Sequence, residues 1–567
     1  MMHKIIKIIA LASIFYLPLQ IAHAYSTSTI NAPVTQVNEN QVFRDMVIHY
    51  VRAVANHKIL NAPLPKSQLD LRWSDNYQHS RWSVQVMIYY QGHKIGQGSA
   101  QQAGLTQVVT QATEDALSQV TLPKISEKEL SLFRFKVSFD YYPNQYYSFI
   151  EYLDKGLELI GNRIAIRLLN TQLLKQQIAN SQQYLLNAMH PSLHGFSKAY
   201  NAALDTRDDE LRTIYSSSSL YTFLKLYQLN RDPKLEKHFK PIADFILSMQ
   251  LQSGPNTGGF YYSYEPNTNK KSCRLVVGTA SKTIFTLLEL YHFYHDDKYL
   301  AAAKHAGDWL LTMIKPDGQV TPVAQCNNNI WHYNNRQSFL YSGQVLSALS
   351  RLYRVTKDQR YYAGATKIAN HFISETQKQG LFLGDNYRPQ NTISTSWVLM
   401  SLIDYAKINH DEIYRKLIRQ LSKSILSMQI LDSHDIYLYG RYRDTRKPSG
   451  NGWINEVIGS LYEFCQSSQL TDCQQYRKPM ILTSRWLMQN SYTQANTYDI
   501  KNPSQAIGGF ISFFSTQLVR TDAVCHGVNS LIILLQMVGQ TNQTLLVVPE
   551  RPLADVLPSL RAGQGFL

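Results

Sequence analysis

Asp522, His526 and Glu456 are the residues whose types and placement best fit proton-transfer chemistry in this 567-residue chain. Asp522 follows Arg520 by two residues and precedes His526 by four, so one helical face would carry both the carboxylate and the imidazole. Glu456 follows the glycine-rich run 450–452, predicted as a turn that a ligand can approach closely. We predict Asp522 and Glu456 as acid and base, His526 as a third catalytic group, and Arg520 as a substrate-binding residue. A helix cap for Asp522 and a plain helix-start carboxylate for Glu456 stay open as alternatives.

Several further carboxylates lie just before stretches predicted as helices, where loops would bring them to a common cleft. Cleavage of a glycosidic bond needs a proton donor and a base or nucleophile, and epimerisation or elimination needs a base beside an acidic C–H bond. We predict Asp385 to contact substrate. The complete set of additional carboxylates is Asp208, Asp209, Glu210, Asp385 and Asp499.

Aromatic and guanidinium side chains in predicted loops indicate sugar binding. Trp331 and His332 lie in one such loop, Tyr439 and Arg441 lie in another, and Arg212 heads a predicted helix. Aromatic rings can stack on sugar faces and arginine forks can bind carboxylates. We therefore predict all five as substrate-binding residues. Because the chain has 37 tyrosines, many of them in Leu-Tyr pairs at helix ends, a packing role competes with this interpretation.

The elements that must position these residues follow from an internal repeat. A helical hairpin recurs about six times between Ser216 and the C-terminus, each with an apolar helix, a polar turn carrying Asp and a second, amphipathic helix. The repeat length of roughly 55 to 65 residues indicates a helical array, and six hairpins predict a mostly α fold closed into a ring. The first helices are predicted near Leu220, Thr283, Gln344, Trp397, Ile454 and Ala523.

The segment 1–24 has the order of a secretory signal peptide. Lys4 and Lys7 precede an apolar run over residues 8–19, and Ala22-His23-Ala24 offers cleavage after Ala24. This order of charged, apolar and small residues is typical of exported proteins. A membrane anchor is the alternative, but the run is shorter than the ~20 residues that span a bilayer. We expect a periplasmic or secreted protein with no stable membrane insertion.

The composition is that of a folded, basic protein. Hydrophobic residues make up 44% and charged residues 17%, and the formal net charge is +15. The positive charge is spread along the chain, which disfavours a nucleic-acid partner and matches an acidic polysaccharide or anionic lipid headgroups. General solubility charge is the alternative. The length predicts two domains.

Five cysteines fit an oxidising compartment. Cys465 can pair with Cys473 across a short loop and Cys273 with Cys326 between neighbouring loops, which leaves Cys525 over. The sequence alone does not fix this connectivity. Neither CxxC nor HExxH occurs, so no metal site and no cofactor are predicted.

Residues 25–40 are predicted as a flexible leader and residues 41–190 as an α/β domain. The domain has a helix over residues 41–57, strands around a Gln91-Gly92 turn, a helix over 105–120 and a strand within 130–142.

This order resembles the AMMECR1-like domain. The resemblance is carried by the glycine turn, by Ala112, Asp115 and Ala116 in the helix, and by the run 154–158. Where that family has Arg-Gly-Cys-Ile-Gly, this sequence has Lys-Ile-Gly-Gln-Gly over residues 94–98. The resemblance therefore implies a structural module, or one that docks a protein partner, more than a cysteine-dependent activity.

The hairpins resemble the six-hairpin, (α/α)6-toroid superfamily, which includes glycosidases, polysaccharide lyases and glucuronyl C5-epimerases. The resemblance places a toroid over residues 205–545 and a tail over 546–567, and it implies hydrolysis, epimerisation or elimination on a polysaccharide or oligosaccharide. Cys525-His526-Gly527 also resembles the zinc-binding triplet of lanthionine cyclase-like toroids, but no second cysteine stands at a matching helix start.

The sequence departs from the toroid pattern at two inner-helix starts. It has Gln344 and Tyr215 where relatives favour a Glu or a His. A non-catalytic glycan-binding or protein-docking toroid therefore stays open beside the enzyme.

Overall fold

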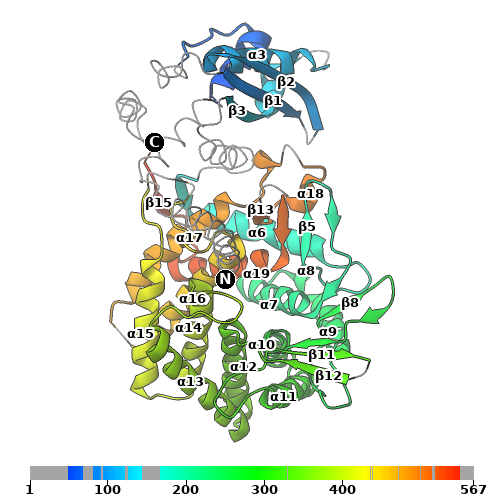
Figure 1. Cartoon of the computed structure of the whole chain (residues 1–567), viewed down its shortest axis with the longest axis vertical. Coiled ribbons are helices and arrows are strands. Elements are labelled where there is room, and N and C mark those ends of the chain that lie inside the picture. Colours follow the sequence, from blue (N-terminus) through cyan, green and yellow to red (C-terminus); the bar gives the residue numbers. More distant parts are fainter. Residues whose placement is uncertain are drawn as a thin grey trace, which may run out of the picture. The chain divides into compact units, whose positions relative to one another are not determined.

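The computed structural model describes residues 47, 49–67, 81–90, 93–121, 125–142, 166–328, 330–433, 436, 438–469, 471–497, 500–513 and 517–549 (Figure 1). The chain divides into two compact units. The α/β unit takes residues 1–89, 94–161 and 550–567, and the helical unit takes residues 162–549 together with 90–93. The predicted signal peptide, the leader and residues 550–567 of the predicted tail lie outside the described residues.

The α/β unit has the strands and the helix expected from its sequence. Its three strands form one sheet in the order β2-β1-β3, with β1 and β3 antiparallel. Val84, Val86 and Ile88 alternate along β1 and are buried, as one face of a half-covered sheet requires. The elements are β1 (Arg81–Tyr90), β2 (His93–Ala103), α3 (Leu105–Ser118), α4 (Glu127–Leu132) and β3 (Arg134–Tyr142).

Two glycines of the run 94–98 let β2 lie directly against α3. A Cβ atom on Gly96 would lie 2.2 Å from the carbonyl oxygen of Ala116, and one on Gly98 would lie 2.2 Å from that of Ala112. Only glycine fits at such a close approach. These glycines therefore have a packing role, and the resemblance to the AMMECR1-like domain stays a prediction.

The helical unit confirms the predicted ring of hairpins. Six inner helices pack side by side, each against two neighbours, and each also packs against the outer helix of its own hairpin (Figure 1). The inner helices are α7 (Thr213–Asn230), α10 (Val277–Tyr294), α12 (Phe339–Thr356), α14 (Thr392–Ala406), α16 (Pro448–Ser467) and α19 (Thr521–Val538). Their outer partners, in the same order, are α9 (Phe239–Ser248), α11 (Asp297–Thr312), α13 (Gln359–Gln379), α15 (Glu412–Ser427), α17 (Arg477–Gln489) and α6 (Thr171–Ala188).

The last hairpin joins the two ends of the helical unit. Helix α6 packs on α19, and α19 packs on α7, which closes the ring. Strand β4 (Leu168–Asn170) pairs with β15 (Thr544–Val547) beside this closure. The predicted domain boundary at residue 190 is therefore wrong, because α6 belongs to the ring. The tail predicted from residue 546 also begins too early, because β15 extends to Val547.

The turns from inner to outer helices explain the Asp residues of the repeat. Arg231, His295 and Lys357 end α7, α10 and α12 in the left-handed conformation, with φ of 53°, 54° and 59°. The following Asp296 and Asp358 accept hydrogen bonds from backbone N–H groups at the starts of α11 and α13. Such side-chain caps satisfy the first donors of a helix. A sharp turn and a capped restart therefore recur from hairpin to hairpin.

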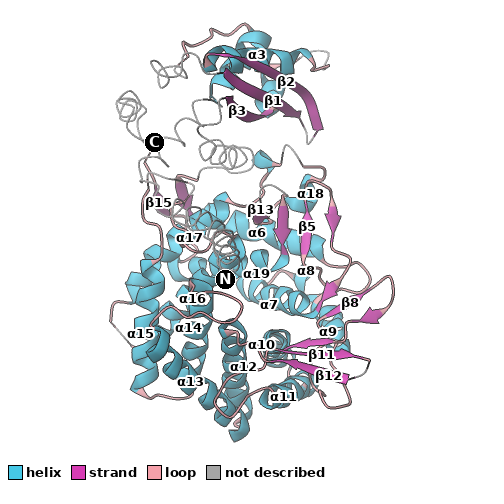
Figure 2. Cartoon of the chain, viewed as in Figure 1, coloured by secondary structure: helices cyan, strands magenta, loops and turns pink. Residues whose placement is uncertain are grey.

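Strands gather at the amino ends of the inner helices, and Figure 2 shows β5, β8, β11 and β12 on one side of the helices. Strands β7, β10 and β14 lead directly into α7, α10 and α19. The three small sheets are β7 (Leu211–Arg212), β8 (Ser263–Glu265) and β9 (Lys270–Lys271); β10 (Arg274–Val276), β11 (Val323–Asn327) and β12 (Ile330–Asn334); and β5 (Ala199–Asn201), β6 (Thr206–Arg207), β13 (Ile511–Phe513) and β14 (Leu518–Arg520). Short helices are α8 (Pro233–Glu236), α18 (Pro503–Ala506), η2 (Cys473–Tyr476) and η3 (Gln494–Asn496).

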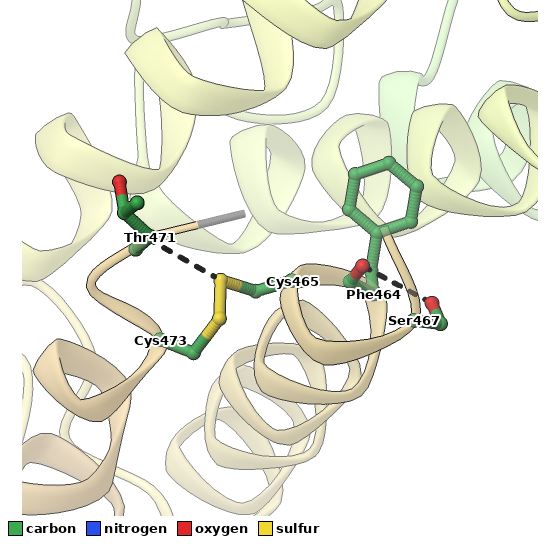
Figure 3. Close-up of a disulfide and its surroundings, with 5 residues drawn as sticks. All are labelled: Phe464, Cys465, Ser467, Thr471 and Cys473. Carbon is green, nitrogen blue, oxygen red and sulfur yellow. Dashed lines mark hydrogen bonds between the residues drawn. A yellow bond between two sulfur atoms is a disulfide. The ribbon is translucent and has the colours of Figure 1, made fainter. Parts of the chain in front are cut away.

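Both disulfides considered from the sequence are present. Cys273, directly before β10, forms a disulfide with Cys326 on β11. Cys465, near the end of α16, forms a disulfide with Cys473. Figure 3 shows the second bond, with the sulfur of Cys465 also near the carbonyl of Thr471. Cys525 lies outside both disulfides and is buried.

Helix α19 is the one described helix that is long and apolar enough to span a membrane, and most of it is buried within the ring.

Candidate active site

The six inner helices point matching residues toward the centre of the ring. Their ninth and thirteenth residues all line one cavity of about 520 Å³, which we call the inner cavity. The ninth residues are Tyr221, Phe285, Ser347, Met400, Glu456 and Asn529, and the thirteenth are Lys225, Glu289, Arg351, Asp404, Ser460 and Ile533. The repeat therefore holds its register all the way around, and each position gives one layer of side chains.

The sixth residues form the layer nearest the amino ends. Trp397 and Trp453 stack with ring centroids 3.5 Å apart, and the Lys282 ammonium lies 4.7 Å and 4.9 Å from their centroids. His526 meets Trp453 edge to face at 5.1 Å. These four side chains, called the aromatic floor below, line the inner cavity at its amino-terminal end. Burial lowers the pKa of Lys282 to about 8, although Glu456 opposes this shift.

His526 and Glu456 form a hydrogen-bonded pair at the aromatic floor. Nδ1 of His526 lies 2.7 Å from Oε2 of Glu456, and Nδ2 of Asn529 donates to Oε1 at 3.2 Å. Burial would raise the pKa of Glu456, but the hydrogen bond and charge of His526, with the charge of Lys282, lower it below its ordinary value. Glu456 is therefore held as a carboxylate.

The glycine-rich run before Glu456 brings the two helices together. The run 450–452 was predicted as a turn but lies in the first turns of α16. A Cβ on Gly452 would lie 2.9 Å from the backbone nitrogen of Gly527, so glycine lets α16 and α19 approach closely. Glu456 lies well inside α16, so its helix-start alternative is wrong as well.

A second cluster, the mouth cluster, lies one turn above the aromatic floor. Arg520 donates two hydrogen bonds to Asp522, at 2.9 Å and 2.7 Å, and a longer one of 3.3 Å to the hydroxyl of Tyr215. At the start of the neighbouring helix α7, Arg212 repeats this pattern with Glu210 at 2.9 Å and with the hydroxyl of Tyr262 at 2.9 Å. The complete cluster is Glu210, Arg212, Tyr215, Tyr262, Arg520 and Asp522.

Charge keeps Asp522 ionised within this cluster. Burial would raise the pKa of Asp522, but the hydrogen bonds and charge of Arg520, and the charge of His526, lower it. Burial and the charge of Asp522 raise the pKa of Tyr215 well above its ordinary range, so its hydroxyl stays protonated. The structure thus brings Asp522, His526, Glu456, Arg520 and Arg212 into one region of the ring. Asp522 is the second residue of α19 and not its cap, which is Arg520.

The other predicted substrate residues do not share this location. Trp331 and His332 lie on the edge strand β12, with His332 exposed. The carboxylate of Asp385 accepts a hydrogen bond from the backbone N–H of Phe339, the first residue of α12, at 2.8 Å. This bond gives Asp385 a structural role in holding the start of the helix. Tyr439 is buried at 8% exposure beside Ile436, Leu482 and Val548, which contradicts its predicted contact with substrate.

Arg441 and Asp499 are two remaining residues predicted from the sequence. Arg441 is half-buried in the loop after Tyr439, where its N–H bonds the carbonyl of Leu438. Asp499 lies outside the described residues. No group of three His, Cys, Asp or Glu side chains that could hold a metal occurs in the described ranges.

Lys282, Trp397 and Trp453 were not among the predicted site residues. Each is the sixth residue of its inner helix, at the position of His526 in α19. An alignment of the six repeats to a common first residue would have placed all four in one layer. Loop aromatics were considered instead, because a tryptophan within a helix usually belongs to the core.

The sequence profile of glycosyl hydrolase family 76 matches residues 256–395. This match confirms the predicted class, an enzyme that processes a polysaccharide. No curated protein matches the chain significantly.

Solved structures similar to this chain include three carbohydrate enzymes. The GH76A alpha-1,6-mannanase from Salegentibacter sp. HEL1_6, as an inactive variant in complex with alpha-1,6-mannotriose, aligns at 11% identity and TM-score 0.46 over 64% of this chain and 99% of that one. An unsaturated glucuronyl hydrolase specific for heparin aligns at 13% identity and TM-score 0.47, over 65% of this chain and 98% of that one. Cellobiose 2-epimerase from Spirochaeta thermophila aligns at 14% identity and TM-score 0.46, over 64% of this chain and 96% of that one.

Proposed function

We propose that the helical unit hydrolyses glycosidic bonds of a polysaccharide at the mouth cluster. The observation that carries this is the placement of His526 between two carboxylates, bonded to Glu456 and within the electrostatic reach of Asp522. The family 76 match over residues 256–395 supports hydrolysis over epimerisation and elimination.

The roles of the two carboxylates follow from their protonation. The predicted assignment made one of Asp522 and Glu456 the acid, but a general acid must carry a proton at the working pH, and the pKa of both is lowered. We assign Asp522 as the base or nucleophile. His526 is the proton donor, since Glu456 holds Nδ1 and leaves Nε2 to exchange a proton with the leaving oxygen.

The substrate we propose is an acidic polysaccharide outside the cytoplasm. Arg212 and Arg520 stand in the mouth, and exposed Lys447 lies close enough to Arg520 and Asp522 for their charges to affect its pKa. Arginine forks can bind uronate carboxylates, although both forks already bind carboxylates of the protein. The order of residues 1–24 supports export to the periplasm or medium.

The test is a screen of the chain from Tyr25 to Leu567 against neutral and uronate-containing polysaccharides, with products read by mass spectrometry. We expect a new reducing end from at least one glycan, lost in Asp522→Asn and His526→Ala and kept in Asp297→Asn, an exposed carboxylate on α11. An unsaturated product would instead indicate elimination. Binding without product would favour the glycan-binding or docking alternative.

A further inference from the structure

The inner cavity lies on the opposite side of the aromatic floor from the mouth cluster. It opens where the inner helices end, because exposed His292, Arg354, Lys407 and Glu463 line it one turn beyond the thirteenth-residue layer. This end carries the turns from inner to outer helices, the short helices α8 and η2, and the β4–β15 pair. The cavity is therefore a compartment with its own opening.

The wall of the inner cavity alternates donors and acceptors around the ring. In the thirteenth-residue layer, Lys225, Glu289, Arg351 and Asp404 follow one another on four consecutive inner helices. Arg351 and Asp404 bind each other at 2.9 Å. In the described part of the chain, neither Lys225 nor Glu289 has an ion-pair or hydrogen-bond partner, although Lys225 lies 5.0 Å from the ring centroid of Tyr221.

Polar groups at the inner end are also incompletely paired. Oδ1 of Asn529 is buried and has no hydrogen-bond partner among the described residues. The Lys282 ammonium lies near the rings of Trp397 and Trp453 and has no hydrogen-bond or ion-pair partner among the same residues. Unpaired buried polar groups cost free energy, which a ligand with matching groups recovers. Tyr221, Phe285 and Trp397 supply apolar ring surface beside them.

We propose that the inner cavity binds a neutral mono- or disaccharide. Sugar hydroxyls both donate and accept, so one ring can use ammonium, carboxylate and amide groups together, and its C–H face can pack on aromatic rings. A wall of alternating charge suits such a ligand better than an anion, which Glu289 and Glu463 would repel. A volume of about 520 Å³ lies within the range of small-ligand pockets.

This site does not require the mouth cluster to be catalytic. The test is isothermal titration of the chain from Tyr25 to Leu567 with neutral hexoses and their disaccharides, and with sulfate as an anion control. We expect at least one saccharide to bind and sulfate not to bind. Ser460 faces the inner cavity from α16, and Ser460→Phe should fill the cavity and weaken binding at least tenfold.

Ser467→Phe is the matched control, because Ser467 is on the same helix, is exposed and, like Ser460, bonds a backbone carbonyl (Figure 3). Lys225→Met and Glu289→Gln should each weaken binding and serve if Ser460→Phe does not fold. Three outcomes overturn the proposal: no saccharide binds at millimolar concentration, sulfate alone binds, or binding survives the cavity variants and is lost in Arg520→Met. Loss of turnover in Asp522→Asn with saccharide binding retained separates the two sites.

Discussion

The side chains of His526 and Glu456 meet across two neighbouring inner helices, with Nδ1 of the histidine 2.7 Å from Oε2 of the glutamate. The backbones of α16 and α19 come this close because position 452 is glycine, where a Cβ atom would lie 2.9 Å from the backbone nitrogen of Gly527. A packing feature thus orients an imidazole. The pair links the mouth cluster to the wall of the inner cavity.

Glu456→Gln should lower kcat by about 100-fold or more, because general acid catalysis contributes on that order and the amide no longer holds the imidazolium. KM should change little, since Glu456 positions His526 and does not lie in the mouth cluster. Steady-state kinetics on the glycan found in the screen measure both constants. Glu412→Gln, exposed on an outer helix, should keep both. If Glu456→Gln instead lowered kcat/KM by the same factor through a higher KM alone, Glu456 would not be positioning His526 for catalysis.

Arg520→Met should shift the acid limb of the pH–rate profile to higher pH. Arg520 lowers the pKa of Asp522 in the native enzyme, and the base works only when ionised. Without the guanidinium the pKa rises, so activity is lost at a higher pH as the solution is acidified. The measurement is kcat/KM across pH, with Arg419→Met on α15 as the control. An acid limb that does not move would remove Asp522 from the role of base.

Lys282→Met should stabilise the protein at neutral pH. The folded-state pKa of about 8 lies below the unfolded value, so the folded state binds fewer protons between about pH 8 and about pH 10.4. The cost of burying the ammonium is complete below pH 8 and disappears as the pH rises through this window. We expect the free energy of unfolding to rise by about 1–2 kcal/mol at pH 7 and this gain to vanish above about pH 10.5. The figure is smaller than the full pKa shift implies because the side chain is incompletely buried. Denaturant unfolding at several pH values checks it, and a gain that is constant with pH would contradict it.

Replacing Cys273 and Cys326 by serine should destabilise the helical unit more than replacing Cys465 and Cys473. The first bond spans a sequence separation of 53 residues and the second spans 8. Chain-entropy loss in the unfolded state predicts about 4 kcal/mol for the longer loop and about 2.5 kcal/mol for the shorter. Thermal unfolding of the two double variants gives the order. The reverse order would mean that native contacts at the short loop matter more than loop length.

The hairpin ring was predictable because its signal is repeated and local. Apolar periodicity and Asp-bearing turns predict all six inner helices. The pairing of α6 with α19 was not predictable in this way, since α6 lies before the repeat region predicted from Ser216 and joins the ring through contacts with α19 that are distant along the chain.

The candidate site was predictable only where residues are close in sequence. Arg520, Asp522 and His526 share one helix start, so their proximity follows from helical spacing. Lys282 and the two stacked tryptophans come from three separate hairpins, and only the register of the repeat brings them together. Tyr439 was misassigned because a tyrosine in a loop has the same sequence pattern whether its ring faces solvent or packs on Leu482 and Val548.

The pairing of α6 with α19 has a consequence during synthesis of the chain. Helix α6 ends at Ala188 and leaves the ribosome first of the ring helices, whereas its partner α19 begins only at Thr521 and is the last ring helix to emerge. Until then the parts of α6, α7 and α16 that pack against α19 stay uncovered. A nascent chain that stops early lacks α19 and with it Asp522 and His526, so it would present a seam of apolar surface to chaperones and proteases. The candidate site can therefore form only after α19 has emerged.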